Sequence, residues 1–328
     1  MRPRLEIHVP ISPTPNFLNR IHYLAASLKD AGGLARESSI VVTVGADQEP
    51  VDLSALLPWS RRYPIRWRWV DRDTFRRFTF YGTALDRFRV DFSAPMVLMA
   101  DADVIVTRDF GDLVESVQKT GAYSGVIAHI SPWSEDHLSQ RTAEEWWQAI
   151  FDRAGVGAVP FTCEHTSWNV LTPPEAPRFC PPYFNFGVML APSECFASIG
   201  ESIFRDMETV NSVLLTPYRC QIALSVSLVR SGWPYRIMPL RYNFPNFPAI
   251  AEVNLEELRD IRIIHYINQD YFKKDQTLDS VENVSAWLDS HNRLPSIQQL
   301  LRDRIGKVHR RVLYDRASRF ERLRMVWN

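Results

Sequence analysis

Residues 95–106, PMVLMADADVIV, decide the fold class of this chain. The first part of the stretch, Pro95 to Ala100, is entirely apolar, which is typical of a strand buried inside a sheet. Two carboxylates, Asp101 and Asp103, follow this run without a break, and three β-branched residues come next. The stretch therefore predicts a central strand with an acidic pair at its carboxyl end.

The segments that precede this strand indicate a parallel sheet with crossover helices. Strands are predicted over Leu5–Ile11, Ile40–Val44 and Ile65–Val70, because these runs alternate in polarity or are apolar and β-branched. Asn16 is expected to cap a helix that ends at Gly32–Gly33, and helical spacing returns over Thr74–Phe88. This order predicts an α/β fold, in which ligands bind beyond the carboxyl ends of the strands.

The second half of the chain continues the pattern after an irregular stretch. Residues 131–182 are rich in Pro and Trp and predict elaborated loops with one helix over Thr142–Ala154. Four further elements are expected: a strand over Tyr183–Leu190, helices over Glu201–Leu215 and Gln221–Val229, and a strand over Arg262–Tyr266. We therefore expect a mixed, mainly parallel sheet flanked by helices within residues 1–275, and a basic helical extension over residues 276–328.

The composition is compatible with one large domain. Of the 328 residues, 45% are hydrophobic, which is enough apolar surface for a large core. The 38 basic and 38 acidic residues give a formal net charge of +0, so a nucleic-acid-binding surface is not indicated. No apolar run reaches the roughly 18 residues that a membrane-spanning helix needs.

The four cysteines, Cys163, Cys180, Cys195 and Cys220, show no CxxC spacing. They indicate reduced thiols, as in a cytoplasmic protein. A zinc site that includes Cys163 and His165 is the alternative, but a structural zinc site needs about four ligands and this pair supplies two.

The acidic pair points to a metal site. Buried carboxylates are costly unless a cation or hydrogen bonds compensate their charge, and Mg²⁺ or Mn²⁺ bound by carboxylates keeps positions open for phosphate oxygens. A solvated turn at the end of the strand is the plain alternative. A phosphatase of the haloacid-dehalogenase type is another, but its DxDxT pattern would require Thr where Ile105 stands.

Three segments, in this order, make the chain resemble the GT-A glycosyltransferases, most closely the glycogenin and lipopolysaccharide galactosyltransferase family. Residues 99–106, MADADVIV, are similar to that family's YLDADVLV, and residues 183–190, YFNFGVML, are similar to its YFNAGVML. Residues 263–266, IIHY, resemble its late strand that ends in a metal-binding His. The resemblance implies a GT-A fold and a glycosyltransferase that uses a nucleotide-sugar donor, with UDP expected as the nucleotide.

The resemblance also implies that Asp101, Asp103 and His265 hold Mn²⁺ (or Mg²⁺) beneath the donor diphosphate, with Ala102 between the two acids at the same site. Such an ion neutralises the charge that develops on a departing nucleotide diphosphate, and imidazole beside two carboxylates suits Mn²⁺. An ordinary hydrogen-bonded histidine is the alternative for His265. Retention of the anomeric configuration is expected, while an inverting enzyme would need a base such as Glu252 or Asp270.

The family's donor-sugar contacts correspond here to Asn185, Gly187 and Gln221. Asn185 and Gln221 are the expected catalytic positions, although a β-bulge with a structural Asn would also explain Asn185 and Gly187. The chain departs from the family at Cys220, where an acid normally precedes the Gln, and it lacks the Gly-x-x-Lys-Pro-Trp segment after the His. Lys273 or Lys274 is expected to reach the diphosphate instead, unless the pair is simply solvated.

Loops near the strand ends are expected to complete the donor site. Ile11 and Ser12 follow the first strand, and Gly45 and Asp47 follow the second. These residues are candidates for binding the base or the ribose, with an ordinary turn as the alternative. Arg87 and Arg89 lie shortly before the acidic pair and are candidates for positioning it or the diphosphate, unless they belong to a basic helix surface. Arg89 is the one we assign to the donor site.

The acceptor is expected to be a saccharide or a glycolipid. Residues 131–182 are assigned to the acceptor side, where aromatic rings can stack on sugars or can simply form core. These aromatic candidates are Trp133, Trp146, Trp147, Phe161 and Trp168. The basic amphipathic C-terminus, with Ile305, Val308, Val312, Phe320, Leu323 and Trp327 on its apolar side, either lies on an anionic membrane or packs on the body.

The sequence thus predicts a cytoplasmic, metal-dependent glycosyltransferase, with peripheral membrane contact through the C-terminal helix as one interpretation. A non-catalytic nucleotide- or sugar-binding protein on the same fold is the rival. Cys220 and the missing Lys-Pro-Trp segment favour the rival, whereas the intact set of Asp101, Asp103 and His265 argues against it.

Overall fold

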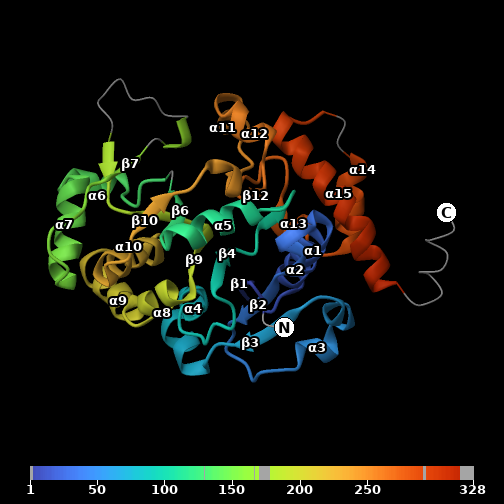
Figure 1. Cartoon of the computed structure of the whole chain (residues 1–328), viewed down its shortest axis with the longest axis horizontal. Helices are drawn as coiled ribbons and strands as arrows, with labels where there is room; N and C mark the ends of the chain where they lie inside the picture. Colours follow the sequence, from blue (N-terminus) through green and yellow to red (C-terminus); the bar gives the residue numbers. More distant parts are fainter. Residues whose placement is uncertain (1–2, 129, 166, 170–177, 291–292, 318–328) are drawn as a thin grey trace.

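The computed structural model describes residues 3–128, 130–165, 167–169, 178–290 and 293–317. Its centre is a seven-stranded sheet in the order β10-β6-β9-β4-β1-β2-β3, shown in Figure 1. In chain order these strands are β1 Leu5–Ile11, β2 Ser39–Val44, β3 Ile65–Trp69, β4 Met96–Ala100, β6 Tyr123–Ile127, β9 Phe184–Pro192 and β10 Tyr235–Ile237. Every pairing is parallel except those of β9, which runs antiparallel to both β4 and β6.

A second, three-stranded sheet lies close to the end of β4. It has the order β11-β12-β5 and consists of β5 Val104–Val106, β11 Phe244–Pro245 and β12 Ile263–His265. A small hairpin pairs β7 Cys163–His165 with β8 Arg178–Cys180. The mixed, mainly parallel sheet and its GT-A-like order of elements are as predicted.

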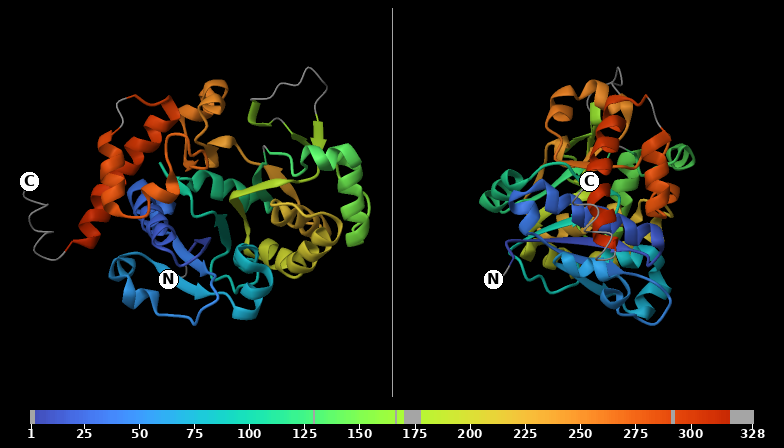
Figure 2. Two further views of the ribbon diagram at one scale, coloured as in Figure 1. Left: turned by 180° about the vertical axis from the view of Figure 1, so that it is seen from behind. Right: turned by 90° about the vertical axis from the view of Figure 1, so that its right-hand side faces the viewer.

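Helices cover both faces of the large sheet, as the two views of Figure 2 show. They are α1 Pro15–Ala31, α2 Gly33–Glu37, α3 Leu53–Leu56, α4 Arg72–Asp86, α5 Gly111–Thr120, α6 Glu135–Gln140, α7 Ala143–Ala154, α8 Ser193–Gly200, α9 Ile203–Val213, α10 Arg219–Ser231, α11 Pro248–Val253, α12 Leu255–Arg259, α13 Lys274–Thr277, α14 Val281–Ser290 and α15 Ser296–Arg316. Short 3₁₀ turns occupy Pro58–Arg62, Ser167–Asn169 and Leu240–Tyr242.

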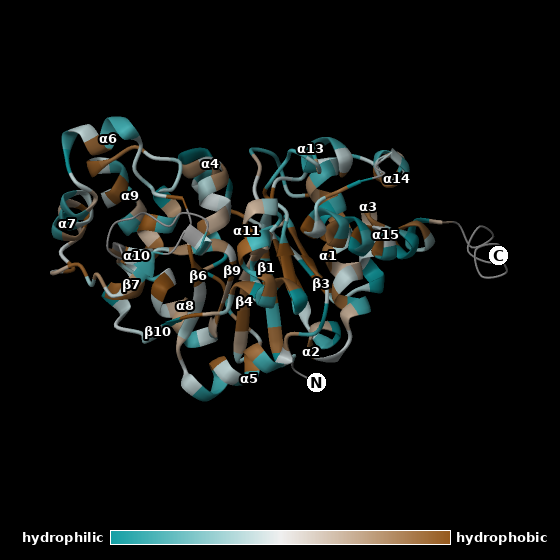
Figure 3. Ribbon diagram, turned by 90° about the horizontal axis from the view of Figure 1, so that it is seen from above, coloured by the Kyte–Doolittle hydropathy of each residue, from teal (hydrophilic) through white to brown (hydrophobic). Residues whose placement is uncertain are grey.

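Strand β4 separates two hydrophobic cores because its side chains alternate between the two faces. Leu98 belongs to the core that includes α1, α5 and α15, while Val97 and Met99 belong to the core that includes α7 to α10. Both faces of the strand are therefore buried, which explains why residues 96–100 carry no polar side chain. In Figure 3 the central strands are correspondingly hydrophobic, and the covering helices alternate in polarity.

The sequence-based boundaries agree closely, with some differences. Thr14, not Asn16, occupies the N-cap position of α1. Asn16 lies within the helix, and its amide donates to the carbonyl oxygens of Lys274 and Asp275 at 3.2 and 2.5 Å. Helices α5 and α6 and strand β6 had no predicted counterpart. Asn16 thus connects α1 to α13 instead of beginning its own helix.

The C-terminal helix α15 packs its apolar side onto the body of the protein. Ile305, Val308 and Val312 are buried in the same core as α1. Buried Arg304 donates to the carbonyl oxygens of Val106 (2.6 Å) and Ser27 (2.8 Å), which ties the helix to β5 and α1. The other apolar residues predicted for this face, Phe320, Leu323 and Trp327, lie outside the described residues.

Among the described residues, no helix has the length and apolar character needed to cross a bilayer. The boundary between residues 1–275 and 276–328 stays a prediction.

Candidate active site

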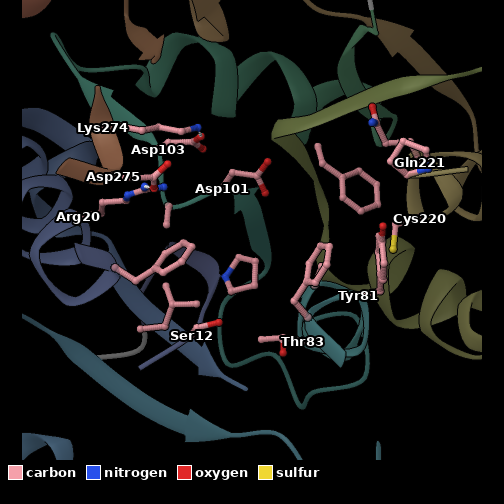
Figure 4. Close-up of a pocket in the computed structure, with 18 of the residues that line it drawn as sticks. Ser12, Arg20, Tyr81, Thr83, Asp101, Asp103, Cys220, Gln221, Lys274 and Asp275 are labelled. Carbon is pink, nitrogen blue, oxygen red and sulfur yellow. Dashed lines mark hydrogen bonds and ion pairs between the residues drawn. The ribbon is translucent and has the colours of Figure 1, made fainter. Parts of the chain in front are cut away.

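A cavity of about 430 Å³ opens beyond the carboxyl ends of β1 and β4, between α4 and α13. Figure 4 shows Asp101 at its centre, between two walls. One wall comes from the end of β1, helix α1 and α13, and includes Ser12, Arg20 and Lys274. The other wall comes from α4 and α10, and includes Tyr81 and Gln221. Distant segments of the sequence therefore meet around the acidic pair, where the fold predicts a ligand.

Three side chains form a possible metal-binding group at this cavity: Asp101 and Asp103 line it, and His265, which does not line it, contacts Asp103. One ligand atom from each of Asp101, Asp103 and His265 lies within 4.8 Å of the others, and this is the one such group of three found among the described residues. Asp103 and His265 are buried, and His265 Nε2 lies 3.3 Å from Asp103 Oδ1. The predicted ligand set is therefore assembled in space.

Backbone pairing brings His265 to the acidic pair. Strand β12 runs antiparallel to β5, which places His265 opposite Val104, directly after Asp103. The N–H of Tyr266 donates to the carbonyl oxygen of Asp103 at 2.9 Å. The register of a short three-stranded sheet thus joins two motifs that are more than 160 residues apart in the sequence.

Gly187 makes room for the imidazole of His265. A Cβ at this position would lie 2.2 Å from His265 Nδ1, closer than two non-bonded atoms can approach. Asn185, two residues earlier on β9, accepts hydrogen bonds at Oδ1 from the N–H of Gly187 (2.8 Å) and from Asn243 Nδ2 (3.0 Å). Neither residue lines the cavity, so both lie behind the metal-binding group on the side of His265.

The two acids differ in electrostatic environment. Burial raises the pKa of Asp101, an effect that the positive charge of Arg87 partly offsets. Burial also opposes the ionisation of Asp103, but His265 and Lys274 outweigh it and hold the pKa of Asp103 well below its usual range. Asp103 is therefore the carboxylate that stays ionised, and Asp101 is the one whose ionisation most needs an added positive charge.

Arg87, rather than Arg89, faces the acidic pair. The side chain of Arg87 is fully buried; Nη1 donates to the carbonyl oxygen of Ala100 at 2.8 Å, and Nη2 lies 3.7 Å from Asp101 Oδ1. Arg89 is exposed, and its guanidinium lies 5.1 Å from the ring centroid of Phe204. The structure thus places the predicted Arg89 away from the cavity and its neighbour Arg87 behind Asp101.

Lys274 reaches the site from α13. Its ammonium group pairs with Asp103, on the carboxylate oxygen that does not face His265. The next residue, Asp275, pairs with Arg20 of α1, and both of these residues line the cavity. Lys273 is exposed and is absent from the lining. Lys273 and Lys274 were both candidates for reaching the diphosphate, and of the two only Lys274 lies beside the acids.

Cys220 and Gln221 lie together in the first turn of α10 and both line the cavity. Burial raises the pKa of the Cys220 thiol to about 12, and its sulfur lies 3.7 Å from the sulfur of Met207. The thiol is therefore neutral and apolar where the resembled family has an acid. Gln221 Oε1 is buried and has no hydrogen-bond partner among the described residues, which is uncommon for a buried polar atom.

Of the two loops that were predicted to bind the donor, only the one after β1 reaches the cavity. Ile11 and Ser12 line the cavity, as does Ala102, but Gly45 and Asp47 do not. Asp47 Oδ1 accepts from Arg72 Nε (2.7 Å) and Arg76 Nε (2.9 Å) on the exposed side of α4. A Cβ at Gly45 would lie 1.7 Å from the hydroxyl of Thr83, so this glycine allows α4 to pack closely against β2.

Several cavity residues were not predicted from the sequence. They are Pro10, Phe17, Arg20, Phe80, Tyr81, Thr83, Ala84, Phe186, Pro217, Tyr218 and Asp275. Phe17 is only partly buried, and its ring centroid lies 4.6 Å from the guanidinium of Arg20. A pattern of apolar residues cannot distinguish a core position from the wall of a cavity, because both are shielded from most of the solvent.

The aromatic residues predicted for the acceptor side are mostly core. Trp133, Trp146 and Trp147 are buried in one cluster, in which the rings of Trp133 and Trp147 meet edge to face at 5.2 Å. Trp168 is also buried and donates from Nε1 to the carbonyl oxygen of Ile127. It lines a second cavity, of about 300 Å³, at the ends of β6 and β10. Phe161 is partly buried, and none of these rings lines the first cavity.

The cysteines carry free thiols and are all buried. Cys163 lies directly opposite Cys180 in the β7–β8 hairpin, two residues from His165. The zinc alternative at Cys163 and His165 finds no third ligand within reach among the described residues.

Comparisons with known proteins agree with this geometry. The family model of the Rhodobacterales glycosyltransferase domain matches residues 20–232, which is 213 of the 328 positions. This match includes Asp101, Asp103, Asn185 and Gln221, but it ends before His265. No protein with a curated description matches the chain.

Two solved structures of LgtC resemble the chain in fold. An active-site mutant of LgtC aligns with a TM-score of 0.53 and 15% identity, covering 88% of this chain and 97% of that one. The galactosyltransferase LgtC in complex with donor and acceptor sugar analogues aligns with a TM-score of 0.53 and 16% identity, covering 91% and 99%. The chain therefore belongs to the Rhodobacterales glycosyltransferase domain family and is a glycosyltransferase with the GT-A fold.

Proposed function

We propose that this protein transfers a sugar from a nucleotide-sugar donor, with UDP as the nucleotide, to a saccharide or glycolipid acceptor with the help of Mn²⁺ or Mg²⁺. The observation that carries the proposal is the group of Asp101, Asp103 and His265, in which both acids line the cavity and His265 contacts Asp103. Two carboxylates and one imidazole are a donor set that fits these ions. Burial raises the pKa of Asp101 even though Arg87 lies beside it, so a bound cation would favour the ionised form of this carboxyl.

A divalent ion held by these three residues would neutralise the charge of the leaving nucleotide diphosphate. Arg87 acts from behind, where it keeps Asp101 oriented toward the cavity. Lys274 lies beside Asp103 and can exchange part of this ion pair for a phosphate oxygen of the donor. Gly187 and Asn185 support His265, so their role is to position a ligand of the metal.

The two walls of the cavity suit the two ends of the donor. Ile11, Ser12 and Phe17 supply an apolar and hydroxyl-bearing surface for the nucleoside. The wall of α10 then receives the sugar, where Gln221 lines the cavity as a polar residue and Cys220 offers an apolar surface. The published complex of LgtC contains donor and acceptor sugar analogues, and this supports a cavity that serves both substrates.

Retention of the anomeric configuration is the outcome that the cavity favours. An inverting enzyme needs a free carboxylate base near the acceptor. The carboxylates that line the cavity in the described chain are Asp101, Asp103 and Asp275. The first two belong to the metal-binding group and Asp275 is paired with Arg20, while Glu252 and Asp270 do not line the cavity.

A cytoplasmic location with peripheral contact to an anionic membrane remains part of the proposal. The exposed Arg310 of α15 supplies positive charge for that contact, whereas the exposed Lys307 is paired with Asp30 of α1. Vesicle co-sedimentation with and without anionic lipid measures it directly.

The first test is calorimetric titration of the protein with UDP in the presence and absence of Mn²⁺. We expect binding that requires Mn²⁺ and weakens at least about 100-fold in Asp103→Ala, because a first ligand of the ion is lost. Asp289→Ala, an exposed acid of α14, is the matched control and should bind as the unaltered protein does. Binding that is indifferent to both Mn²⁺ and Asp103 would refute the proposed site.

A non-catalytic binding protein is the second candidate, and the apolar thiol of Cys220 beside Gln221 is the observation that favours it. Hydrolysis of UDP-glucose or UDP-galactose, lost in Asp101→Ala, decides between the two. Binding of UDP and Mn²⁺ without hydrolysis or transfer would support the binding protein.

A further inference from the structure

One residue of the cavity wall is an exposed aromatic side chain. Three lining residues are exposed there, namely Phe80, Pro217 and Asp275. The ring of Phe80 is 59% exposed although it belongs to the wall of a cavity. It lies 4.1 Å from the ring centroid of Tyr81, which faces the interior of the cavity in Figure 4. Single exposed apolar residues are common on protein surfaces, so the exposure of Phe80 is informative only because the same residue forms part of the cavity wall.

The backbone just before Phe80 is strained. Thr79 has φ 54° and ψ −141° inside α4, where its neighbours are helical. A β-branched residue rarely adopts a positive φ, because its Cβ substituents collide with the backbone. Such strain persists only where the surrounding structure imposes it, and it gathers at ligand-binding sites. The break at Thr79 interrupts the helix immediately before the two rings of the wall.

Contacts on both sides hold this break in place. Before it, Phe78 packs on Phe204 at 5.1 Å and Arg77 pairs with Glu208 of α9. After it, the guanidinium of Arg219 lies 4.4 Å above the ring of Tyr81. Both halves of α4 are thereby fixed to α9 and α10, and Phe80 lies between them, where its ring contacts Tyr81.

The position of Phe80 relative to the metal-binding group identifies its ligand. Asp103 is buried where it lines the cavity, so a donor held there by its diphosphate occupies the inner part of the cavity. The second substrate enters from solvent and meets the outer rim. On the α4 and α10 side this rim is apolar and uncharged, formed by Phe80 and Pro217.

We infer that Phe80 is a specificity-determining residue of the acceptor subsite, and that the acceptor is a saccharide whose pyranose ring stacks its apolar face on Phe80. Flat aromatic rings bind such faces through burial of C–H groups. The strained turn at Thr79 supplies the orientation of the ring. This inference rests on the proposed function, since it assumes a donor bound at Asp101 and Asp103.

The experiment compares Phe80→Ala, Phe80→Trp and Phe179→Ala. Phe179 is a matched control, because it is 51% exposed on β8 and does not line the cavity. The probes are UDP binding with Mn²⁺, hydrolysis of UDP-glucose and UDP-galactose, and transfer to lactose and to the methyl glycosides of glucose and galactose.

We expect Phe80→Ala to raise the acceptor KM at least about tenfold while UDP affinity and donor hydrolysis change less than about twofold. Phe80→Trp should retain the low KM because it keeps a flat ring, and Phe179→Ala should behave as the unaltered protein does.

Three results would overturn the inference: an acceptor KM unchanged in Phe80→Ala, a UDP affinity that falls as much as the acceptor KM rises, or donor hydrolysis with transfer to none of these saccharides. The second result would mean that Phe80 stacks on the nucleobase. Failure of the proposed function itself is distinguishable, because the unaltered protein would then bind no UDP with Mn²⁺.

Discussion

At the scale of single residues, Gly187 connects the sheet to the metal-binding group. It was singled out from the sequence because glycine weakens a strand unless another group approaches closely. The approaching group is the ring of His265, which would collide with any Cβ at this position. The same glycine thus makes room for His265, which the proposed function assigns to the metal, and it does not itself line the cavity.

We predict that Gly187→Ala lowers the free energy of unfolding by about 1–3 kcal/mol, the usual cost of overpacking, and weakens Mn²⁺-dependent UDP binding because His265 is displaced. Urea unfolding and calorimetry measure the two effects. Gly306→Ala on α15 is the control, since its Cβ would meet Leu288 at an ordinary 3.4 Å and helix propensity favours Ala by up to about 1 kcal/mol. Equal behaviour of the two variants would contradict this account.

Residue identity alone could not separate Arg87 from Arg89. Arg87 and Arg89 are two positions apart shortly before the same strand, and each carries a guanidinium that can bind an anion. The turn after α4 buries Arg87 behind Asp101 and leaves Arg89 exposed against Phe204. The two side chains point to different places because of the direction in which the backbone leaves α4. The residue types around Arg87 and Arg89 do not specify that direction.

At the scale of secondary structure, α4 contains the clearest departure from a regular element. Helical spacing was predicted over Thr74–Phe88 and a helix is present over Arg72–Asp86, but it is broken at Thr79. Nothing in the local sequence FRRFTFYG marks the break, because no Pro or Gly stands at the strained residue. The aromatic contacts of Phe78 and Tyr81 with neighbouring helices impose it.

We predict that Thr79→Gly is more stable than Thr79→Ala by about 1–2 kcal/mol, because only Gly adopts the positive φ without strain. In a regular helix the order would be reversed, since Ala is favoured over Gly by about 1 kcal/mol. Thermal or urea unfolding of the two variants gives the sign. A more stable Ala variant would show that the helix is continuous at this position.

At the scale of the whole molecule, the C-terminal helix is an integral part of the core. Buried Asp315 of α15 interacts with His22 of α1 at 3.5 Å and accepts hydrogen bonds from Arg62 (3.0 Å) and Tyr63. The ring of His22 stacks on Trp59 at 3.9 Å. This polar cluster joins the first helix of the chain to the last one that the structure describes.

The cluster makes the stability of the protein depend on pH. Burial lowers the pKa of His22 from 6.5 to about 4, so the unfolded chain binds a proton at higher pH than the folded one. Stability therefore falls as the pH drops from 6.5 to 4, by about 3 kcal/mol for this group. Burial opposes ionisation of Asp315, but its hydrogen bonds lower its pKa to about 2, so its contribution is lost below the pKa of the unfolded carboxyl, near pH 4.

We predict that His22→Phe loses less stability than the unaltered protein between pH 7 and pH 4.5, because its side chain does not titrate. Urea unfolding at several pH values measures the difference. An identical pH dependence in the two proteins would mean that His22 does not govern this window.

The sequence by itself determined the α/β class, the strand that ends in Asp101 and Asp103, and the three segments that mark a GT-A glycosyltransferase. Local patterns suffice for these features, because hydrophobic periodicity and motif spacing are properties of neighbouring residues. The placement of His265 beside the acids also followed from the sequence, but only through resemblance to a family.

The tertiary structure alone decided which residues share the cavity. It brought in Arg20, Phe80 and Asp275, placed Gly45 and Asp47 outside, and put Trp133, Trp146 and Trp147 into the core. A cavity wall is assembled from strands and helices far apart in the sequence, and its shape depends on how those elements pack. The residue types in the cavity wall also occur in the core and on the surface. Only long-range packing therefore distinguishes a wall residue from a core or surface residue.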